Sequence, residues 1–296
     1  MKRVSEYIML GLLIFAGVIF FTAVASLFFK NSDNSGGLSL SISGDRIGLI
    51  EVKGVILDSE PIVKNIKKFR ENASIKGILV RIDSPGGGVA ASQEIYEALK
   101  KARDAGKVVV ASMSSVAASG GYYVACAADT IVANPGTTTG SIGVILNFFD
   151  FSELLEKLGL RYNVVKSGRF KDAGSIGRPM TPEDKAYFQE FVNDAFEQFV
   201  AVVAEARRMS REEVLKLADG RVYTGKQAFE NGLVDILGTY EDAIDLIVEM
   251  AQISGKPHIV RPTRRKTSVF DLLLSDVTEL VQSIQRWPVL RYQWVF

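Results

Sequence analysis

The stretch KVVVASMSSVAASGGYY, residues 107–123, decides the fold. Its first part, KVVVASM (107–113), is an apolar, β-branched run that predicts a buried strand. Ser119 and two glycines follow, and residues 119–128 are predicted to form a helix. A strand that passes through a tight turn into a helix is typical of α/β folds.

Strands and helices alternate on both sides of this unit. The predicted strands are 47–56, 77–83, 130–134, 141–146 and 161–168, and the predicted helices are 61–72, 89–105, 181–208, 210–218, 225–231 and 240–252. This alternation predicts an α/β fold with mostly parallel strands. Because sites in such folds lie beyond the carboxyl ends of strands, the loops 84–88 and 113–121 are the candidate site.

The N-terminal segment, residues 8–29, carries no charged residue and is long enough to cross a bilayer as a helix. Lys2 and Arg3 precede it, which favours a cytoplasmic N-terminus. A cleaved signal peptide is the alternative, but the apolar run is longer than is usual for one. We therefore expect an anchor (1–30), a flexible tether (31–45) and a main domain (46–255). The chain would then be a single-pass protein of the cytoplasmic membrane, with its main domain on the extracytoplasmic side.

The C-terminal part, residues 256–296, has a different character. It begins with a basic segment and continues as a predicted amphipathic helix. The apolar face of that helix comprises Phe270, Leu273, Leu274, Val277, Leu280, Val281 and Ile284. Docking or oligomerisation is the preferred interpretation, and contact with a membrane surface is the alternative.

Composition narrows the chemistry. The net charge of +1 in 296 residues gives no global attraction to nucleic acid. A single cysteine, Cys126, excludes an intrachain disulfide, and its alanine neighbours predict a buried thiol. The only histidine, His258, lacks the partners of a histidine-based metal site, so we expect no metal. A base for a nucleophilic serine is therefore expected to be a residue other than histidine, and a lysine can serve where burial disfavours its ammonium form.

Ser119 is either part of a plain tight turn or a nucleophile surrounded by backbone amides. It lies at the predicted N-terminus of a helix, where amides are free to donate, so the amide of Gly120 could meet an oxyanion. Gly87 in the other loop is the natural second donor, because a glycine backbone can approach closely. Each motif alone is a weak signal, but both follow buried strands, which makes the pair more specific.

Several ordered motifs carry a resemblance to a known family. DSPGGG (83–88), SMSSVAASGGYY (112–123), NPGTTTGSIGV (134–144) and KSGRFKDAGS (166–175) resemble the short, single-repeat form of the signal peptide peptidase A family. ADGRVYTGKQAFENGLVD (218–235) resembles it too. Members of this family are serine proteases with a ClpP/crotonase fold of repeated ββα units. The resemblance covers residues 45–252.

The resemblance implies a Ser-Lys dyad that needs no cofactor. Ser119 matches the nucleophile, Lys171 the general base and Ser141 the serine that hydrogen-bonds the lysine. Gly87 and Gly120 match the oxyanion donors. From the residues alone, Lys166 would be as good a candidate for the base as Lys171.

The resemblance also implies partners: apolar peptides such as cleaved signal peptides, the lipid bilayer through residues 8–29, and further copies of the chain in a ring. In the short form the base can come from the neighbouring protomer, and the end of the tail could occupy a neighbour's groove. Three alternatives remain open. They are a same-fold membrane protease that cuts stomatin-like proteins, a crotonase-type acyl-CoA enzyme, and a catalytically inactive peptide-binding ring.

Overall fold

The computed structural model describes residues 45–262 and 291–293. The predicted anchor, nearly all of the tether and the amphipathic tail helix lie outside the described residues. Within the described ranges, no helix is both long enough and apolar enough to cross a membrane.

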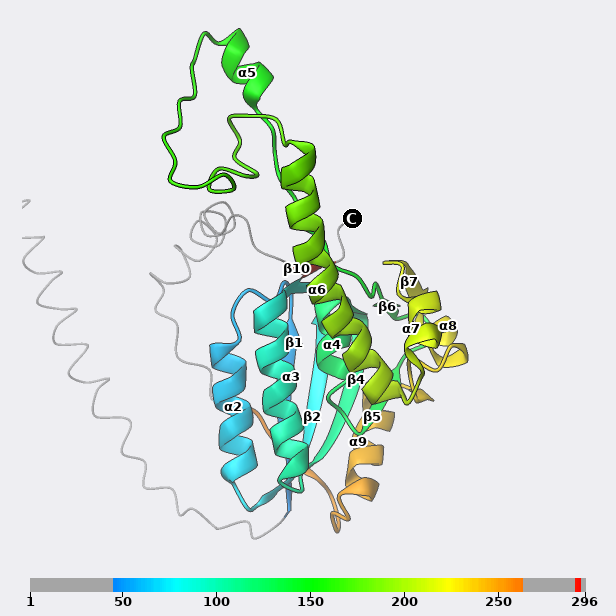
Figure 1. The fold of residues 1–296 in the computed structure, drawn as a ribbon. Coiled ribbons are helices and arrows are strands. Elements are labelled where there is room, and N and C mark those ends of the chain that lie inside the picture. The colour runs from blue at the N-terminus through cyan, green and yellow to red at the C-terminus, as the bar shows by residue number, and fades with distance from the viewer. Residues whose placement is uncertain (1–44, 263–290, 294–296) are drawn as a thin grey trace, which may run out of the picture. The chain divides into compact units, whose positions relative to one another are not determined.

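A central sheet is built from β1 (Arg46–Lys53), β2 (Ile75–Ser84) and β4 (Val108–Ala118), which pair in parallel (Figure 1). β9 (His258–Val260) extends it beside β1, and β6 (Thr138–Gly140) and β5 (Thr130–Ala133) extend it beside β4. β7 (Val222–Thr224) pairs antiparallel with β6, and β8 (Ile236–Leu237) pairs parallel with β5. The expectation of an α/β fold with mostly parallel strands is confirmed.

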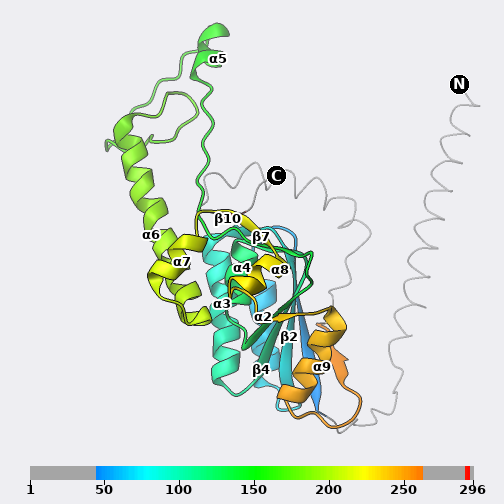
Figure 2. The same ribbon diagram turned by 90° about the vertical axis from the view of Figure 1, so that its right-hand side faces the viewer.

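Helices cover both faces of the sheet (Figures 1 and 2). α2 (Glu60–Glu71), α3 (Val89–Asp104), α4 (Gly120–Ala125) and α6 (Pro182–Arg207) lie on one face, and α9 (Tyr240–Met250) lies on the other. α7 (Arg211–Leu217) and α8 (Gly225–Glu230) pack at the side. Successive strand residues point to opposite faces, so Ile50 of β1 joins the core beneath the four helices while Leu49 joins the core beneath α9.

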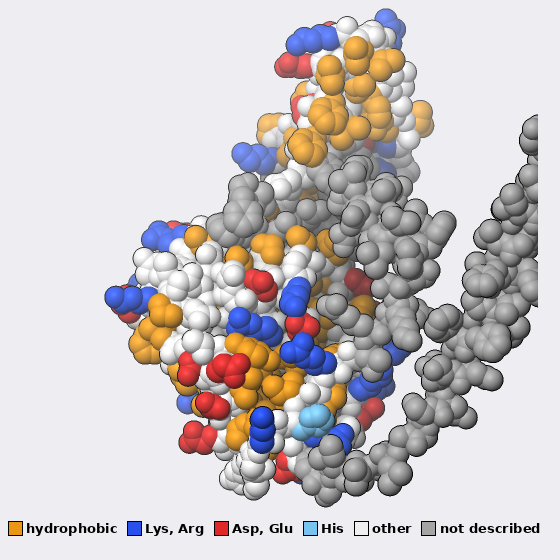
Figure 3. All heavy atoms as spheres, turned by 180° about the vertical axis from the view of Figure 1, so that it is seen from behind, with side chains coloured by type: hydrophobic (Ala, Val, Ile, Leu, Met, Phe, Trp, Pro, Cys, Tyr) orange, Lys and Arg blue, Asp and Glu red, His pale blue; other side chains and the backbone are white. Residues whose placement is uncertain are grey.

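Residues 145–181, which we call the arm, extend beyond the N-terminal end of α6 (Figures 1 and 2). The arm contains α5 (Ser152–Lys157) and otherwise has little regular structure. Large apolar side chains gather on its surface (Figure 3), among them Phe149, Leu158 and Val165.

Two predicted strands are wrong. Neither segment forms a strand: residues 141–146 run from the edge of the domain into the arm, and residues 161–168 lie within the arm. In the second segment, the side chains of Val164 and Val165 are both exposed. The strand predicted to end at 113 instead continues to Ala118, because Val116 to Ala118 pair with β6. The two- and three-residue strands β3 (Gly86–Gly88), β6, β7, β8 and β9 were not expected.

Phe199 of α6 joins the helix layer to α4. Its side chain is fully buried, and its ring lies edge-on to that of Tyr123, with 5.1 Å between the centroids. Phe199→Ala is therefore expected to lower the free energy of unfolding by about 3–5 kcal/mol, the usual cost of emptying a buried aromatic site. Chemical denaturation monitored by circular dichroism measures the change. Phe229→Ala is the matched control, because Phe229 is exposed, and an equal loss in both variants would contradict the assignment of Phe199 to the core.

Candidate active site

Ser119 occupies the turn between β4 and α4 in a conformation that non-glycine residues rarely adopt. Its φ is 53° and its ψ is −116°. Its N–H donates to the Gly140 carbonyl at 2.7 Å, and its own carbonyl accepts from the N–H of Tyr123 at 2.8 Å. The side chain is buried. A strained, buried serine that the surrounding backbone holds in place is a feature of functional sites.

Two glycines allow the elements around Ser119 to approach one another. A Cβ on Gly121 would lie 2.8 Å from the carbonyl oxygen of Ser84. A Cβ on Gly87 would overlap the carbonyl oxygen of Ile56. Two backbone hydrogen bonds hold β3 against Ile56. The Ile56 N–H donates to the Gly86 carbonyl, and the Gly88 N–H donates to the Ile56 carbonyl, each at 2.8 Å. The backbone of β3, which includes Gly87, therefore lies close to α4.

Ser84 was not singled out by the sequence analysis, although it directly follows a buried strand. Its hydroxyl donates to the Gly54 carbonyl at 2.6 Å and accepts from the N–H of Gly86 at 3.1 Å. Its preceding neighbour, Asp83, accepts from the N–H of Val116 at 3.2 Å. These bonds fix the path of the chain from β2 into β3.

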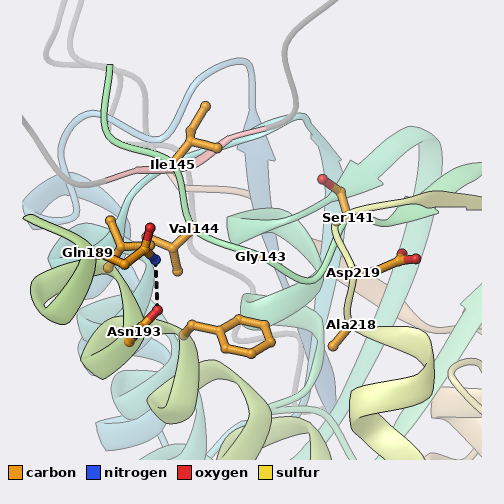
Figure 4. Close-up of a pocket in the computed structure, with 11 residues that line it drawn as sticks. Ser141, Gly143, Val144, Ile145, Gln189, Asn193, Ala218 and Asp219 are labelled. Atoms are coloured by element: carbon orange, nitrogen blue, oxygen red, sulfur yellow. Dashed lines mark hydrogen bonds between the residues drawn. The ribbon is translucent and has the colours of Figure 1, made fainter. Parts of the chain in front are cut away.

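Ser141 is linked to Ser119 by a backbone hydrogen bond. The carbonyl of Gly140, the residue before Ser141, accepts from the N–H of Ser119. Ser141 is buried, has a φ of 51° and donates its N–H to the Arg221 carbonyl at 2.8 Å. It lines a cavity of about 500 Å³ at the root of the arm (Figure 4). The other lining residues are Gly143, Val144, Ile145, Gln189, Val192, Asn193, Phe196, Ala218, Asp219 and Gly220.

The edge of β3 carries a further segment of the chain. β10 (Arg291–Gln293) pairs antiparallel with β3, with Arg291 opposite Gly88 and Gln293 opposite Gly86. This edge, beside the turn that holds Ser119, is thus paired with an extended segment of the same chain. The structure therefore brings four of the five predicted site residues, Gly87, Gly120, Ser119 and Ser141, to one end of the sheet.

Lys171, the fifth, lies in the arm with an exposed side chain. Its neighbour Phe170 stacks on Tyr187 near the start of α6, at 4.9 Å between ring centroids. On α6, Phe199 packs against Tyr123 of α4, about 18 Å further along the helix at 1.5 Å per residue. The structure therefore does not bring Lys171 beside Ser119 within one protomer.

The structure distinguishes Lys171 from Lys166. The Lys166 ammonium donates to the Asp172 carboxylate at 2.6 Å and to the Arg169 carbonyl at 3.1 Å. Among the described residues, the Lys171 side chain has no hydrogen bond or ion pair. Arg178 and Lys166 hold the pKa of the Asp172 carboxyl well below its usual range. Of the two lysines, Lys171 is thus the one whose amine has no carboxylate partner in the described structure.

The remaining candidates for chemistry have structural roles. Cys126 is buried as predicted, and burial raises the pKa of its thiol to about 12, which makes it inert at neutral pH. His258 is exposed. It lies in β9, opposite Arg46 in the parallel ladder with β1. The candidate site lies at the carboxyl end of the same sheet, so His258 does not act on Ser119 of its own protomer.

Comparison with known proteins agrees with this geometry. The model of peptidase family S49 matches residues 101–254. The chain belongs to this family. The Clp protease model also matches, over residues 55–138, which supports an α/β, ClpP-like fold. The S49 membership makes the chain a serine peptidase of the signal peptide peptidase A type.

Relatives support the assignment to family S49. The chain is 47% identical to a putative protease of Synechocystis over 67% of its own length and 72% of the relative's. It is 39% identical to a putative signal peptide peptidase of Enterococcus faecium over 76% of its length and 69% of the relative's. A chloroplastic serine protease of Arabidopsis thaliana is 37% identical over 76% of this chain but only 34% of its own.

The tight contact at Gly87 leads to a prediction about this S49 peptidase. Gly87→Ala would force β3 away from Ile56 and displace the Gly87 amide, so peptidase activity is expected to fall roughly 100-fold or more, as when an oxyanion donor is lost. Gly88→Ala is the matched control, since a Cβ there would meet its nearest atom at an ordinary 3.6 Å. Assays of kcat/KM on a quenched apolar peptide compare the two. Equal activity of both variants would show that the position of Gly87 is unimportant.

Proposed function

We propose that the chain is a membrane-anchored serine endopeptidase that degrades cleaved signal peptides in or near the cytoplasmic membrane. In this proposal Ser119 is the nucleophile and Lys171 of a neighbouring copy is the general base. The observation that carries it is the buried, strained Ser119 between two glycine-containing loops. The position of Lys171 on the arm of the same chain supports a base that acts on another copy.

The chemistry uses a single proton carrier. Neutral Lys171 takes the Ser119 hydroxyl proton while the oxygen attacks the peptide carbonyl carbon, and the N–H groups of Gly87 and Gly120 donate to the resulting oxyanion. The C–N bond then breaks, and the Lys171 ammonium gives its proton to the leaving amine. Water attacks the acyl-enzyme, passes a proton to Lys171, and the proton returns to Ser119 as the acid product leaves. No cofactor takes part in these steps.

The shape of the site suits an extended apolar peptide. β10 on the edge of β3 is an example of an added antiparallel strand, the mode in which sheet edges bind peptides. The cavity beside Ser141 has apolar lining residues, such as Val144 and Phe196, that suit an apolar substrate side chain. Signal peptides are apolar, and an anchor at residues 8–29 would hold the site close to the bilayer where they remain.

The arm is the proposed contact between copies. It exposes large apolar side chains, including Phe149, Leu154 and Leu158 (Figure 3), of a kind that soluble monomers rarely gather on one surface. A second copy is the occupant that also explains the chemistry, because docking of the arm can carry Lys171 to the neighbour's Ser119. Burial in that contact would favour the neutral amine, and in this proposal the neighbour's Ser141 hydrogen-bonds it. Repetition of this head-to-tail contact closes a ring.

Ser119→Ala and Lys171→Ala are each expected to reduce kcat/KM by roughly a thousandfold or more, because each removes a group that acts in every turnover. Cleavage of a quenched signal-peptide fragment by the purified full chain measures the loss, and circular dichroism and sedimentation check folding and assembly. Lys157→Ala is the control, since Lys157 is an exposed lysine of the same arm. Retained activity in Ser119→Ala would refute the assigned nucleophile.

The shared dyad has its own test. When Ser119→Ala and Lys171→Ala chains are co-expressed, random assembly pairs an intact serine with a neighbour's intact lysine at about a quarter of the sites. Activity is therefore expected to return to about that fraction of the wild type. If the dyad were contained in one protomer, every site would lack one member and the mixture would stay inactive.

A further inference from the structure

The aspartate that directly follows Lys171 has both carboxylate oxygens occupied by other cations. Asp172 Oδ1 accepts from Lys166 Nζ at 2.6 Å and from an Arg178 terminal nitrogen at 3.0 Å, and Oδ2 accepts from Arg178 Nε at 3.0 Å. The Asp172 side chain is only 9% exposed. A bidentate arginine pair of this kind fixes the direction of the carboxylate as well as its charge.

Arg178 ties the same cluster to α6. Its other terminal nitrogen donates to Asp184 Oδ2 at 2.6 Å and to the Pro179 carbonyl at 3.0 Å. Asp184 also accepts from the N–H of Thr181 in the capping box that begins α6, and these contacts lower its pKa to about 2. We call Lys166, Asp172, Arg178 and Asp184 the arm ion cluster. Its two positive and two negative charges balance.

The position of Asp172 matters for a base at position 171. A carboxylate close to an amine favours the ammonium form, which cannot accept a proton. Asp172 is the acidic residue nearest to Lys171 in the sequence, yet the arm ion cluster directs its carboxylate to Lys166 and Arg178. The backbone supports this arrangement, because Lys171 N–H donates to Gly168 and Ser175 N–H donates to Asp172, each at 3.1 Å.

We propose that Arg178, assisted by Lys166, is a positioning residue that sequesters the Asp172 carboxylate and so keeps Lys171 available as a neutral base. This inference rests on the proposed function, in which Lys171 is the base. Without Arg178, the Asp172 carboxylate would keep one cation, Lys166, and become free to pair with Lys171.

The other charged groups around the lysine are already paired or exposed. Arg169 contacts Glu183 at 3.5 Å and lies over the ring of Phe170, with both charged side chains more than half exposed. Lys185 and Tyr187 at the start of α6 are exposed. In the neighbour that receives the arm, the charged residues beside Ser141 are Asp219 and Arg221, which pair with each other. Asp172 is the carboxylate of the arm ion cluster that is adjacent to Lys171 in the sequence.

The test is the pH dependence of kcat/KM for the full chain, which reports ionisations of the free enzyme. Activity rises with pH as the base loses its proton. Arg178→Met leaves a carboxylate that favours the protonated amine, so the midpoint is expected to move up by about one pH unit. Below the midpoint the activity then falls about tenfold, and it recovers at high pH. Arg211→Met is the control, because Arg211 also pairs with a glutamate but lies in α7, outside the arm.

A double variant separates this role from a structural one. Asp172→Asn combined with Arg178→Met removes the carboxylate together with its partner, and the midpoint is expected to return to that of the wild type. A loss that is equal at all pH values in Arg178→Met, or a double variant that remains shifted, would overturn the proposal. If Arg178→Met fails to assemble, Lys166→Met is used instead, and a smaller upward shift of the midpoint is expected. An unshifted midpoint in Lys166→Met would then overturn the proposal.

The activity of Lys171→Ala distinguishes failure of the proposed function from failure of the positioning role. If Lys171→Ala retains activity, the proposed base is wrong and the positioning role falls with it. If Lys171→Ala is inactive but neither Arg178→Met nor Lys166→Met shifts the midpoint, the proposed function stands and only the positioning role is refuted.

Discussion

The candidate site depends on one steric constraint: backbones meet where no side chain fits between them. At Gly87 the chain lies against Ile56, and at Gly121 it lies against Ser84. Only glycine permits both approaches, and together they bring the end of β2, the short β3 and the start of α4 to one place. The strain at Ser119 follows, because the chain must turn sharply from β4 into α4 within this confined space.

The domain and the arm are held by different forces. Ladder hydrogen bonds and two apolar cores fix the domain, so the positions of Ser119, Gly87 and Ser141 follow from the packing of the sheet. In the arm, aromatic stacking of Phe170 on Tyr187 and the arm ion cluster take the place of a core. The proposed nucleophile thus lies at one end of a packed sheet, whereas the proposed base is carried by an element whose order depends on a few side chains.

Much of this could be predicted from the sequence, for identifiable reasons. The buried strands β2 and β4 and the helix α6 have strong apolar periodicity or a clear capping signal, and the loops after the strands follow from them. The strands predicted at 141–146 and 161–168 are absent, and in the second segment the apolar residues Val164 and Val165 are exposed. Three-residue strands such as β3 are too short to show a periodic sequence pattern. The arm ion cluster joins residues six apart in an irregular segment, where no repeat reveals which charges meet. The anchor and the roles of Ser119 and Lys171 remain predictions.

The backbone angle of Ser119 has an evolutionary consequence. A non-glycine residue at a φ of 53° costs of order 1–3 kcal/mol, which the surrounding packing must offset. Glycine at this position would relieve that cost and would also remove the hydroxyl. In the proposed mechanism, the most accessible route to a more stable chain at residue 119 would therefore give an inactive one, and selection for activity would keep the serine in place.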